Sequence, residues 1–298
     1  MNRKFIDTVN EICKTSENVP LSEKSSFRIG GAAKLCAFPS NEDEVCRTVA
    51  LCKESGVKYA VLGNMTNVLA GDDGYDGVVI FTTALSDHEF QGTEVKARCG
   101  ASVTALASSA AKKNLGGLEF AYGIPGSLGG AIFMNAGAYG GEMKEVVKSV
   151  RAYDVERGEV REYSADECGF DYRMSRFRNS RDVILSAVLK LKEGDAEKIA
   201  ETMAKNMLLR KEKQPLDKPS AGSTFKRPQG AFAGELIERA GLKGYTVGGA
   251  QVSEKHAGFV VNTGCASEKD VKELISHIKS RVLQTSGILL EEEIIYLD

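Results

Sequence analysis

A dense cluster of glycines is the feature that most restricts how this chain can fold. Nine of the 31 glycines fall between Gly116 and Gly141. The 22 residues from Phe120 to Gly141 carry no charge, and this length matches a membrane span. However, seven of these residues are glycine, and Pro125 and Asn135 interrupt the run. Because glycine favours turns and close backbone approach over a continuous helix, we predict a buried loop and a short helix.

The spacing of the glycines excludes the commonest nucleotide-binding loops. No two glycines are separated by a single residue, so the G-x-G-x-x-G dinucleotide fingerprint and the kinase glycine loop are absent. The chain also lacks Gly-Lys-Ser/Thr and G-x-S-x-G, which excludes a Walker A loop and a hydrolase nucleophile elbow. Three histidines, His88, His256 and His277, do not have metal-ligand spacing, and no metal site is predicted.

Charge and cysteine content restrict the possible partners and the cellular location. Lys+Arg is 39 and Asp+Glu is 41, and this net charge of −2 argues against a nucleic-acid partner or a membrane surface. The seven cysteines form no C-x-x-C pair, and the first residues of the chain contain no apolar signal segment. We therefore expect reduced thiols and a cytoplasmic location.

Segments typical of helices and strands alternate along the chain and predict a mixed α+β fold. A capping box at Ser40 and Asp43 predicts a helix that extends to Glu54. The segment 267–284 is amphipathic, with one apolar face formed by Val271, Leu274, Ile275, Ile278 and Val282. Further helices are expected at 103–113, 195–213 and 234–240, and strands at 57–62, 78–81, 147–153, 159–163, 183–191, 258–261 and 288–297. The loop 214–228 contains three of the six prolines and is the best internal boundary.

The glycine cluster contains a candidate phosphate site. Gly123, Gly126 and Gly129 recur at every third residue around Pro125 and Ser127. Such a run lets main-chain N–H groups point outward, and concave sets of amides bind phosphate. The alternative is a tight buried crossover in which backbones pack closely.

Two further loops contain small polar or cationic residues. The segment Gly63-Asn64-Met65-Thr66-Asn67 follows a predicted strand and could hold a second phosphate, although an Asn-rich turn is equally consistent with it. In the segment 221–228, Ser223 follows a glycine, and Lys226 and Arg227 come shortly after. This loop suits an anionic substrate, and an ordinary surface loop is the alternative.

Three carboxylates interrupt the apolar C-terminal segment 290–295. Because side chains alternate along a strand, Glu291 and Glu293 share one face and Glu292 takes the other. At least one of them lies among apolar neighbours, where a carboxylate needs a hydrogen-bonding or charged partner or has a functional role. Alternation alone does not say which.

Taken together and in this order, several segments resemble the UDP-N-acetylenolpyruvoylglucosamine reductases (MurB, UDP-N-acetylmuramate dehydrogenases). They cover nearly the whole chain and are 26–31, 63–67, 117–142, 172–177, 214–228, 250–262 and 290–295. The segments 123–141 and 222–228 are the most specific. The compact length and the Gly-Ser-Thr-Phe sequence are similar to the shorter, type II branch of the family.

The resemblance implies a flavin-binding fold that needs no Rossmann fingerprint. Residues 1–195 would form an FAD-binding domain of the vanillyl-alcohol-oxidase/p-cresol-methylhydroxylase type, in two subdomains split near 56–75. Residues 196–298 would form a C-terminal α+β substrate domain.

The resemblance also implies which residues hold the FAD. They are Gly63, Asn64, Met65, Thr66, Asn67, Gly123, Ile124, Pro125, Gly126, Ser127, Gly129 and Gly130. Relatives with covalent FAD often place a His in the first loop, where this chain has Met65-Thr66, so noncovalent FAD is expected. Met65 departs from the glycine common in the family and would be strained if its φ were positive.

The family's reaction reduces the enolpyruvyl ether of a UDP-sugar with hydride from NADPH by way of FAD. By resemblance, Arg173 supplies the cation for the enolate-like charge, and Ser223 donates the proton. Glu293, chosen over Glu291 and Glu292 by family register, would stabilise the enol form. Burial among apolar residues would raise its pKa and keep it protonated. Candidate substrate-binding residues are Tyr172, Lys226 and Arg227, whereas His256 could either line the cleft or be structural.

Two other functions fit part of the sequence. An FAD-dependent sugar or lactone oxidase would share the flavin fold but would need neither the 222–226 loop nor the terminal glutamates. A non-enzymatic nucleotide-sugar module would bind phosphates and would be colourless when purified. We expect a monomer with no nucleic-acid partner and no membrane insertion.

Overall fold

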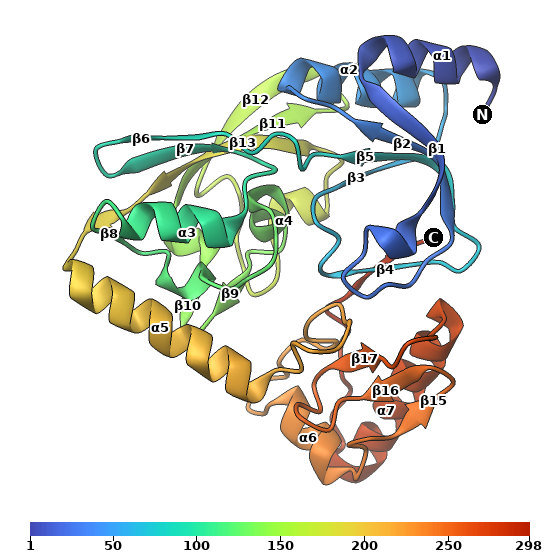
Figure 1. Ribbon diagram of the computed structural model, residues 1–298, viewed down its shortest axis with the longest axis vertical. Coiled ribbons are helices and arrows are strands. Elements are labelled where there is room, and N and C mark those ends of the chain that lie inside the picture. Colours follow the sequence, from blue (N-terminus) through green and yellow to red (C-terminus); the bar gives the residue numbers. More distant parts are fainter. The chain divides into compact units, whose positions relative to one another are not determined.

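The computed structural model describes all 298 residues, which form two compact units. Unit 1 comprises Met1–Glu17, Leu35–Asn64 and Gly77–Leu209, and unit 2 comprises Asn18–Lys34, Met65–Asp76 and Arg210–Asp298. Each unit has its own hydrophobic core. The chain passes between the units inside three strands, once in the loop at 64–65 and once inside a helix, so neither unit is a single stretch of sequence (Figure 1).

One sheet of four strands has the order β1-β2-β5-β3. Its strands are β1 (Lys14–Pro20), β2 (Ala32–Phe38), β5 (Tyr75–Phe81) and β3 (Tyr59–Leu62). β3 and β5 are parallel, with Val61 opposite Ile80. Helices α1 (Arg3–Ile12) and α2 (Glu42–Glu54) contact each other, and their apolar sides are buried in the core of unit 1.

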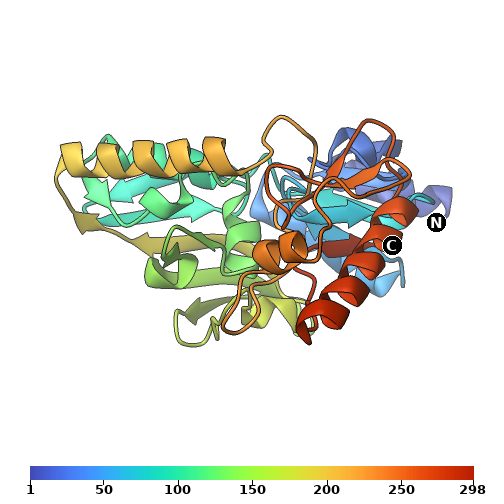
Figure 2. The ribbon, with the colours of Figure 1, turned by 90° about the horizontal axis from the view of Figure 1, so that it is seen from below.

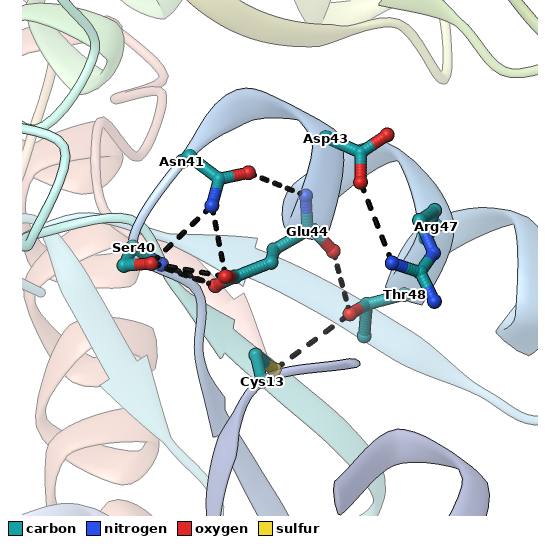
Figure 3. A network of polar contacts seen from close by, with 7 residues as sticks. All are labelled: Cys13, Ser40, Asn41, Asp43, Glu44, Arg47 and Thr48. Carbon is teal, nitrogen blue, oxygen red and sulfur yellow. Dashed lines mark hydrogen bonds and ion pairs between the residues drawn. The ribbon is translucent and has the colours of Figure 1, made fainter. Parts of the chain in front are cut away.

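The start of α2 differs from the predicted capping box. Asn41, not Ser40, is the N-cap residue, and its Oδ1 accepts a hydrogen bond from Glu44 N at 3.0 Å (Figure 3). The Glu44 carboxylate in turn accepts from Ser40 N at 2.6 Å and from Ser40 Oγ at 3.0 Å. The helix therefore begins one residue later than the predicted capping box implies, because Asn41, at an extended φ of −149°, reaches the amide three residues further on.

A second sheet of five strands forms the main layer of unit 1. The order is β12-β11-β13-β7-β6, and every pair is antiparallel. The bounds are β12 Glu159–Ser164, β11 Val147–Asp154, β13 Val183–Lys190, β7 Glu94–Arg98 and β6 His88–Gln91. Central β13 is buried along both faces, which agrees with the apolar residues on both of its faces.

Short helices cover this sheet and place the glycine cluster on it. Helix α4 (Leu128–Phe133) contacts β13 and β7, and α3 (Val103–Ala111) contacts β8 (Leu115–Gly116) and the 3₁₀ turn η2 (Glu119–Ala121). The cluster continues through β9 (Gly137–Ala138) and β10 (Gly141–Glu142). The predicted short helix is therefore confirmed, whereas the loop before it is only partly buried, with Pro125 exposed. Among the helices of the chain, none combines the length and apolar character that crossing a bilayer would require.

Helix α5 (Ala196–Lys213) is the long helix in yellow in Figure 2. Ile199 and Met203 of this helix are buried, and Asn206 Nδ2 donates to Glu119 O at 3.2 Å. β14 (Lys192–Glu193) precedes α5 and pairs with β8. Three further 3₁₀ turns are η1 (Leu21–Glu23), η3 (Met143–Glu145) and η4 (Arg176–Arg178).

Unit 2 contains a small antiparallel sheet packed on one long helix. The sheet has the order β15-β16-β17, with β15 Thr246–Val247, β16 Ala250–Val252 and β17 Val260–Asn262. Helix α7 (Glu268–Ser286) contacts β15, β16 and α6 (Ala233–Arg239). The five residues predicted for its apolar face are the five that are buried. Ser267 and Asp270 form the capping box, and Gly287 ends the helix at a φ of 69°.

The C-terminal strand is much shorter than predicted. Only β18 (Ile295–Leu297) is a regular strand, and it pairs in parallel with β4 (Val68–Ala70). Residues 288–294 are irregular, apart from an isolated bridge between Phe225 and Glu292. β4 offers a partner to three residues only, so the preceding segment pairs with the 224–226 loop instead. The three glutamates therefore do not lie within a regular strand.

Candidate active site

The two loops predicted to hold phosphates meet in unit 1. Asn64 Nδ2 donates to Pro125 O at 3.0 Å. A Cβ on Gly63 would lie 2.1 Å from Ser127 Oγ, so only glycine allows this approach. Two segments about sixty positions apart in sequence thus form one surface.

The loop that contains Pro125 is tightly anchored. Val103 N donates to Gly126 O at 3.2 Å, and Gly129 N donates to Cys99 O at 2.7 Å. Gly123, at a φ of 94°, donates to Thr104 Oγ1 at 3.1 Å. Close packing at the crossover, one of the two sequence-based alternatives, is therefore present.

The same loop leaves amides available at its tip. Ser127 is the N-cap of α4, and its Oγ accepts from Gly130 N at 3.4 Å. The N–H groups of Gly126 and Ser127 donate to no acceptor within the chain. Ile124 and Gly130 flank these amides and are at least partly exposed. The geometry is that of a small amide cradle that an anion could occupy.

The remaining residues of the first loop belong to unit 2. Met65 has a φ of 48° and a buried side chain, so it adopts the left-handed conformation that glycine favours. Its carbonyl oxygen accepts from Ser26 N at 3.4 Å. Thr66 and Asn67 follow, and Asn67 Nδ2 donates to Glu293 O at 3.1 Å. The loop is therefore tied to the C-terminal segment through Asn67.

Arg173 lies in a strained turn of unit 1. Its φ is 54°, and its Nη2 donates to Gly137 O at 3.1 Å. Its own carbonyl oxygen accepts from Arg178 Nη1 at 3.0 Å. The guanidinium also stacks over the exposed Tyr172 ring at 5.1 Å. The structure holds this half-buried cation in a fixed place, and non-glycine residues with positive φ concentrate at functional sites.

Asn135 fixes the Arg173 turn, and the sequence reasoning did not assign it a role. Its side chain is fully buried, and its Nδ2 donates to Glu142 Oε2 at 2.7 Å and to Asp171 O at 2.9 Å. Its Oδ1 accepts from Lys144 N at 2.9 Å. An Asn within an uncharged glycine-rich run was the available signal, because such a buried amide needs several partners.

Ser223 is exposed on a loop of unit 2 whose next residue is fixed. Gly222 precedes it at a φ of 77°. Thr224 N donates to Gly258 O at 2.9 Å, and Thr224 O accepts from Glu293 N at 2.9 Å. The structure thus pairs the Ser223 segment directly with the Glu293 segment.

The three glutamates have different surroundings. Glu291 is exposed, and its Oε2 lies 3.0 Å from Lys226 Nζ. Glu292 accepts from Lys279 Nζ at 2.8 Å and from Tyr296 Oη at 2.5 Å. Burial raises the pKa of Glu292, but the hydrogen bonds from Lys279 and Tyr296 outweigh it and hold the pKa below its usual range. Glu292 is therefore an ionised acceptor for Lys279 and Tyr296. Glu293 is half-buried, and its main-chain N–H is bonded to Thr224 O.

The other candidate residues have clear surroundings. The guanidinium of Arg227 lies 3.8 Å from the centre of the Phe232 ring. His256 Nδ1 accepts from Gly258 N at 3.0 Å, and burial lowers the pKa of this imidazole. This contact shapes the turn that holds Thr224, which is a structural role for His256. No group of three or more His, Cys, Asp or Glu side chains could bind a metal ion.

Two protein-family models match this chain, one in its N-terminal part and one near its C-terminus. A family model described as "FAD binding domain" matches residues 33–164, and "UDP-N-acetylenolpyruvoylglucosamine reductase, C-terminal domain" matches residues 214–297. The UDP-N-acetylenolpyruvoylglucosamine reductase of Caldanaerobacter subterraneus subsp. tengcongensis is 45% identical over 293 residues, which are 97% of each chain.

Solved structures agree with the sequence relatives. The UDP-N-acetylenolpyruvylglucosamine reductase (MurB) of Thermus caldophilus has a TM-score of 0.82 and 34% identity, covering 96% of this chain and 98% of that one. An alkyldihydroxyacetonephosphate synthase has a TM-score of 0.51 at 14% identity, covering 65% of this chain and 41% of that one. This second likeness extends to the fold alone.

Proposed function

Because this chain belongs to the UDP-N-acetylenolpyruvoylglucosamine reductase family, we propose that Arg173, Ser223 and Glu293 perform its chemistry. The protein is an FAD-containing oxidoreductase, a UDP-N-acetylmuramate dehydrogenase that uses NADPH in peptidoglycan precursor synthesis. Its fold combines an FAD-binding domain of the vanillyl-alcohol-oxidase/p-cresol-methylhydroxylase type with the family's C-terminal domain. Family membership removes the oxidase and the non-enzymatic module as alternatives.

The two glycine loops fit a flavin dinucleotide. The contact of Gly63 with Ser127 and the unpaired amides of Gly126 and Ser127 provide a cradle for phosphate oxygens. Gly63, Asn64, Met65, Thr66, Asn67, Gly123, Ile124, Pro125, Gly126, Ser127, Gly129 and Gly130 would hold the FAD. The first loop has no His or Cys to bond the flavin, which supports noncovalent binding. When bound, FAD would supply the hydride-transfer chemistry between NADPH and the double bond of the substrate.

The residues of the chain then have distinct tasks on the substrate. Hydride arrival at the terminal carbon leaves an enolate-like negative charge that extends into the substrate carboxylate. Arg173, fixed by its bond to Gly137 O, would stabilise that charge. Ser223 Oγ would deliver its proton to the neighbouring carbon, and Glu293 would stabilise the enol form as a hydrogen-bond donor.

One observation carries this assignment: the pairing of the Ser223 segment with the Glu293 segment. The bond from Glu293 N to Thr224 O places two candidate proton-carrying groups on adjacent backbones. It also favours Glu293 over its neighbours, because Glu292 is bonded to Lys279 and Tyr296 and Glu291 is exposed beside Lys226.

Finer properties belong to the same proposal. Tyr172, Lys226 and Arg227 would contact the UDP-sugar. In particular, Lys226 pairs with exposed Glu291, a surface contact that a diphosphate can replace at little cost. The division at 195/196, with subdomains split near 56–75, would separate FAD binding from substrate binding. A type II branch, a cytoplasmic location and a monomer complete the proposal.

Anaerobic stopped-flow of the two half-reactions tests the proton donor. In Ser223→Ala, we expect NADPH to reduce the flavin at the wild-type rate. Reoxidation by the enolpyruvyl substrate should slow by about 10²-fold or more, because a general acid contributes about 10²–10⁴-fold. Ser280→Ala, an exposed serine on α7, is the matched control. Equal slowing of both half-reactions in Ser223→Ala would contradict the assignment.

A further inference from the structure

Thr224 stands between the two candidate proton-carrying residues, and all of its polar groups are used. Its side chain is buried with 2% exposure, whereas its neighbour Ser223 is exposed. Its N–H donates to Gly258 O at 2.9 Å. Its carbonyl oxygen accepts from Glu293 N at 2.9 Å. Its side-chain Oγ1 accepts from Val260 N at 3.0 Å.

These three bonds connect the loop that contains Thr224 to two other segments of the chain. Gly258 lies in the turn before β17, and Val260 is the first residue of β17 and part of the core of unit 2. Glu293 belongs to the irregular segment before β18. The side-chain bond is the one that depends on residue type, because the other two use main-chain atoms.

Loss of that bond would move the loop in a predictable direction. Val260 N is buried, and Thr224 Oγ1 is its acceptor, so a methyl group there would leave the N–H unpaired and in close contact. The loop would relax away from β17. Ser223 is bonded directly to Thr224, so its hydroxyl would move relative to Glu293.

We infer that Thr224 is a positioning residue for the reduction, and that its hydroxyl oxygen sets the place of Ser223 relative to Glu293. This inference rests on the proposed roles of Ser223 and Glu293. A displacement of about 1 Å at a reacting group can cost about 10²-fold in rate. The residue itself contacts neither substrate nor cofactor in this role.

The test compares Thr224→Val with Thr224→Ser in the flavin-loaded enzyme. Valine keeps the shape but removes the acceptor, whereas serine retains it. We expect flavin reduction by NADPH to stay within about twofold of wild type in both variants. Reoxidation by the enolpyruvyl substrate should slow roughly 10- to 100-fold in Thr224→Val and recover in Thr224→Ser. Flavin absorbance and thermal unfolding of each variant report whether the holoenzyme is intact.

Ser223→Ala measured in parallel separates the two ideas. If Ser223→Ala slows reoxidation but Thr224→Val does not, the positioning role is wrong and the proton donor stands. If Ser223→Ala leaves reoxidation unchanged, the proposed role of Ser223 as proton donor is wrong. Equal slowing of both half-reactions in Thr224→Val would assign a merely structural role and overturn the inference. Failure of Thr224→Ser to recover the rate would overturn it as well.

Discussion

The side-chain amide of Asn67 donates a hydrogen bond to the main-chain oxygen of Glu293, with an N···O distance of 3.1 Å. In return, Ile295 N donates to Asn67 O at 3.0 Å, next to the register of β18 on β4. One residue of the first candidate phosphate loop thus holds the backbone of the candidate catalytic carboxylate. The unit 2 part of the candidate FAD loop and the candidate catalytic segment are therefore joined by hydrogen bonds.

Asn67→Ala should therefore reduce both stability and catalysis. It removes the donor to a half-buried carbonyl oxygen, which costs about 1 kcal/mol of unfolding free energy. We expect urea unfolding to show that loss and substrate reoxidation of the flavin to slow. Gln284→Ala, at an exposed position on α7, should change neither quantity. An Asn67→Ala protein as stable as wild type would mean that the bond does not form in solution.

Replacements of Arg173 should separate backbone strain from charge. Its φ of 54° costs a residue with a Cβ about 1–2 kcal/mol, and glycine avoids this cost. Arg173→Gly should therefore be more stable than Arg173→Ala by about 1 kcal/mol, measured by chemical unfolding. Both variants should lose substrate reduction to a similar degree, because both lack the guanidinium. A stability order in which alanine exceeds glycine would contradict the left-handed conformation.

Met65→Gly tests whether backbone strain or side-chain burial has the larger effect on stability at Met65. Glycine would relieve the φ of 48°, which gains about 1 kcal/mol. It would also remove a side chain that is 2% exposed, at a cost of about 2–5 kcal/mol for a buried Met. The larger effect should win, so we expect net destabilisation by about 1–4 kcal/mol in urea unfolding. A more stable variant would show that strain outweighs packing at this position.

The Glu292 network predicts a pH-dependent contribution to stability. Hydrogen bonds from Lys279 and Tyr296 hold the pKa of Glu292 below its ordinary value, despite burial. A carboxyl whose folded pKa is lowered stabilises the fold above its unfolded pKa, near 4.3, and this contribution is lost as pH falls through the folded pKa. Glu292→Gln should thus cost about 1–2 kcal/mol at pH 7 and progressively less below pH 4.

Unfolding free energies at a series of pH values from 7 to 3 measure this difference. Glu291→Gln is the control, because Glu291 is exposed and its surface ion pair should contribute little at any pH. A penalty for Glu292→Gln that stays constant across the series would contradict the ionised state of Glu292.

Local sequence patterns were sufficient for much of the fold. The apolar face of α7, the covered strand β13 and the short helix within the glycine cluster follow from periodicity and residue type. The absence of Gly-x-Gly excluded the Rossmann loop, and the remaining glycine-containing segments predicted two candidate phosphate loops. These features are determined locally, because each depends on residues within one element or turn.

The other features depend on hydrogen bonds between residues that are far apart in the sequence. Alternation of side chains along the sequence did not show which of the three glutamates is the candidate catalytic residue. In the folded chain, Lys279 of α7 and Tyr296 donate hydrogen bonds to Glu292, whereas the backbone of Glu293 pairs with Thr224. The predicted long C-terminal strand ended early because β4 pairs with only three residues. Asn135 acquired its role because Glu142, Lys144 and Asp171 converge on one buried amide. A hydrogen bond needs a partner at a set distance, and residues far apart in sequence reach that distance only in the folded chain.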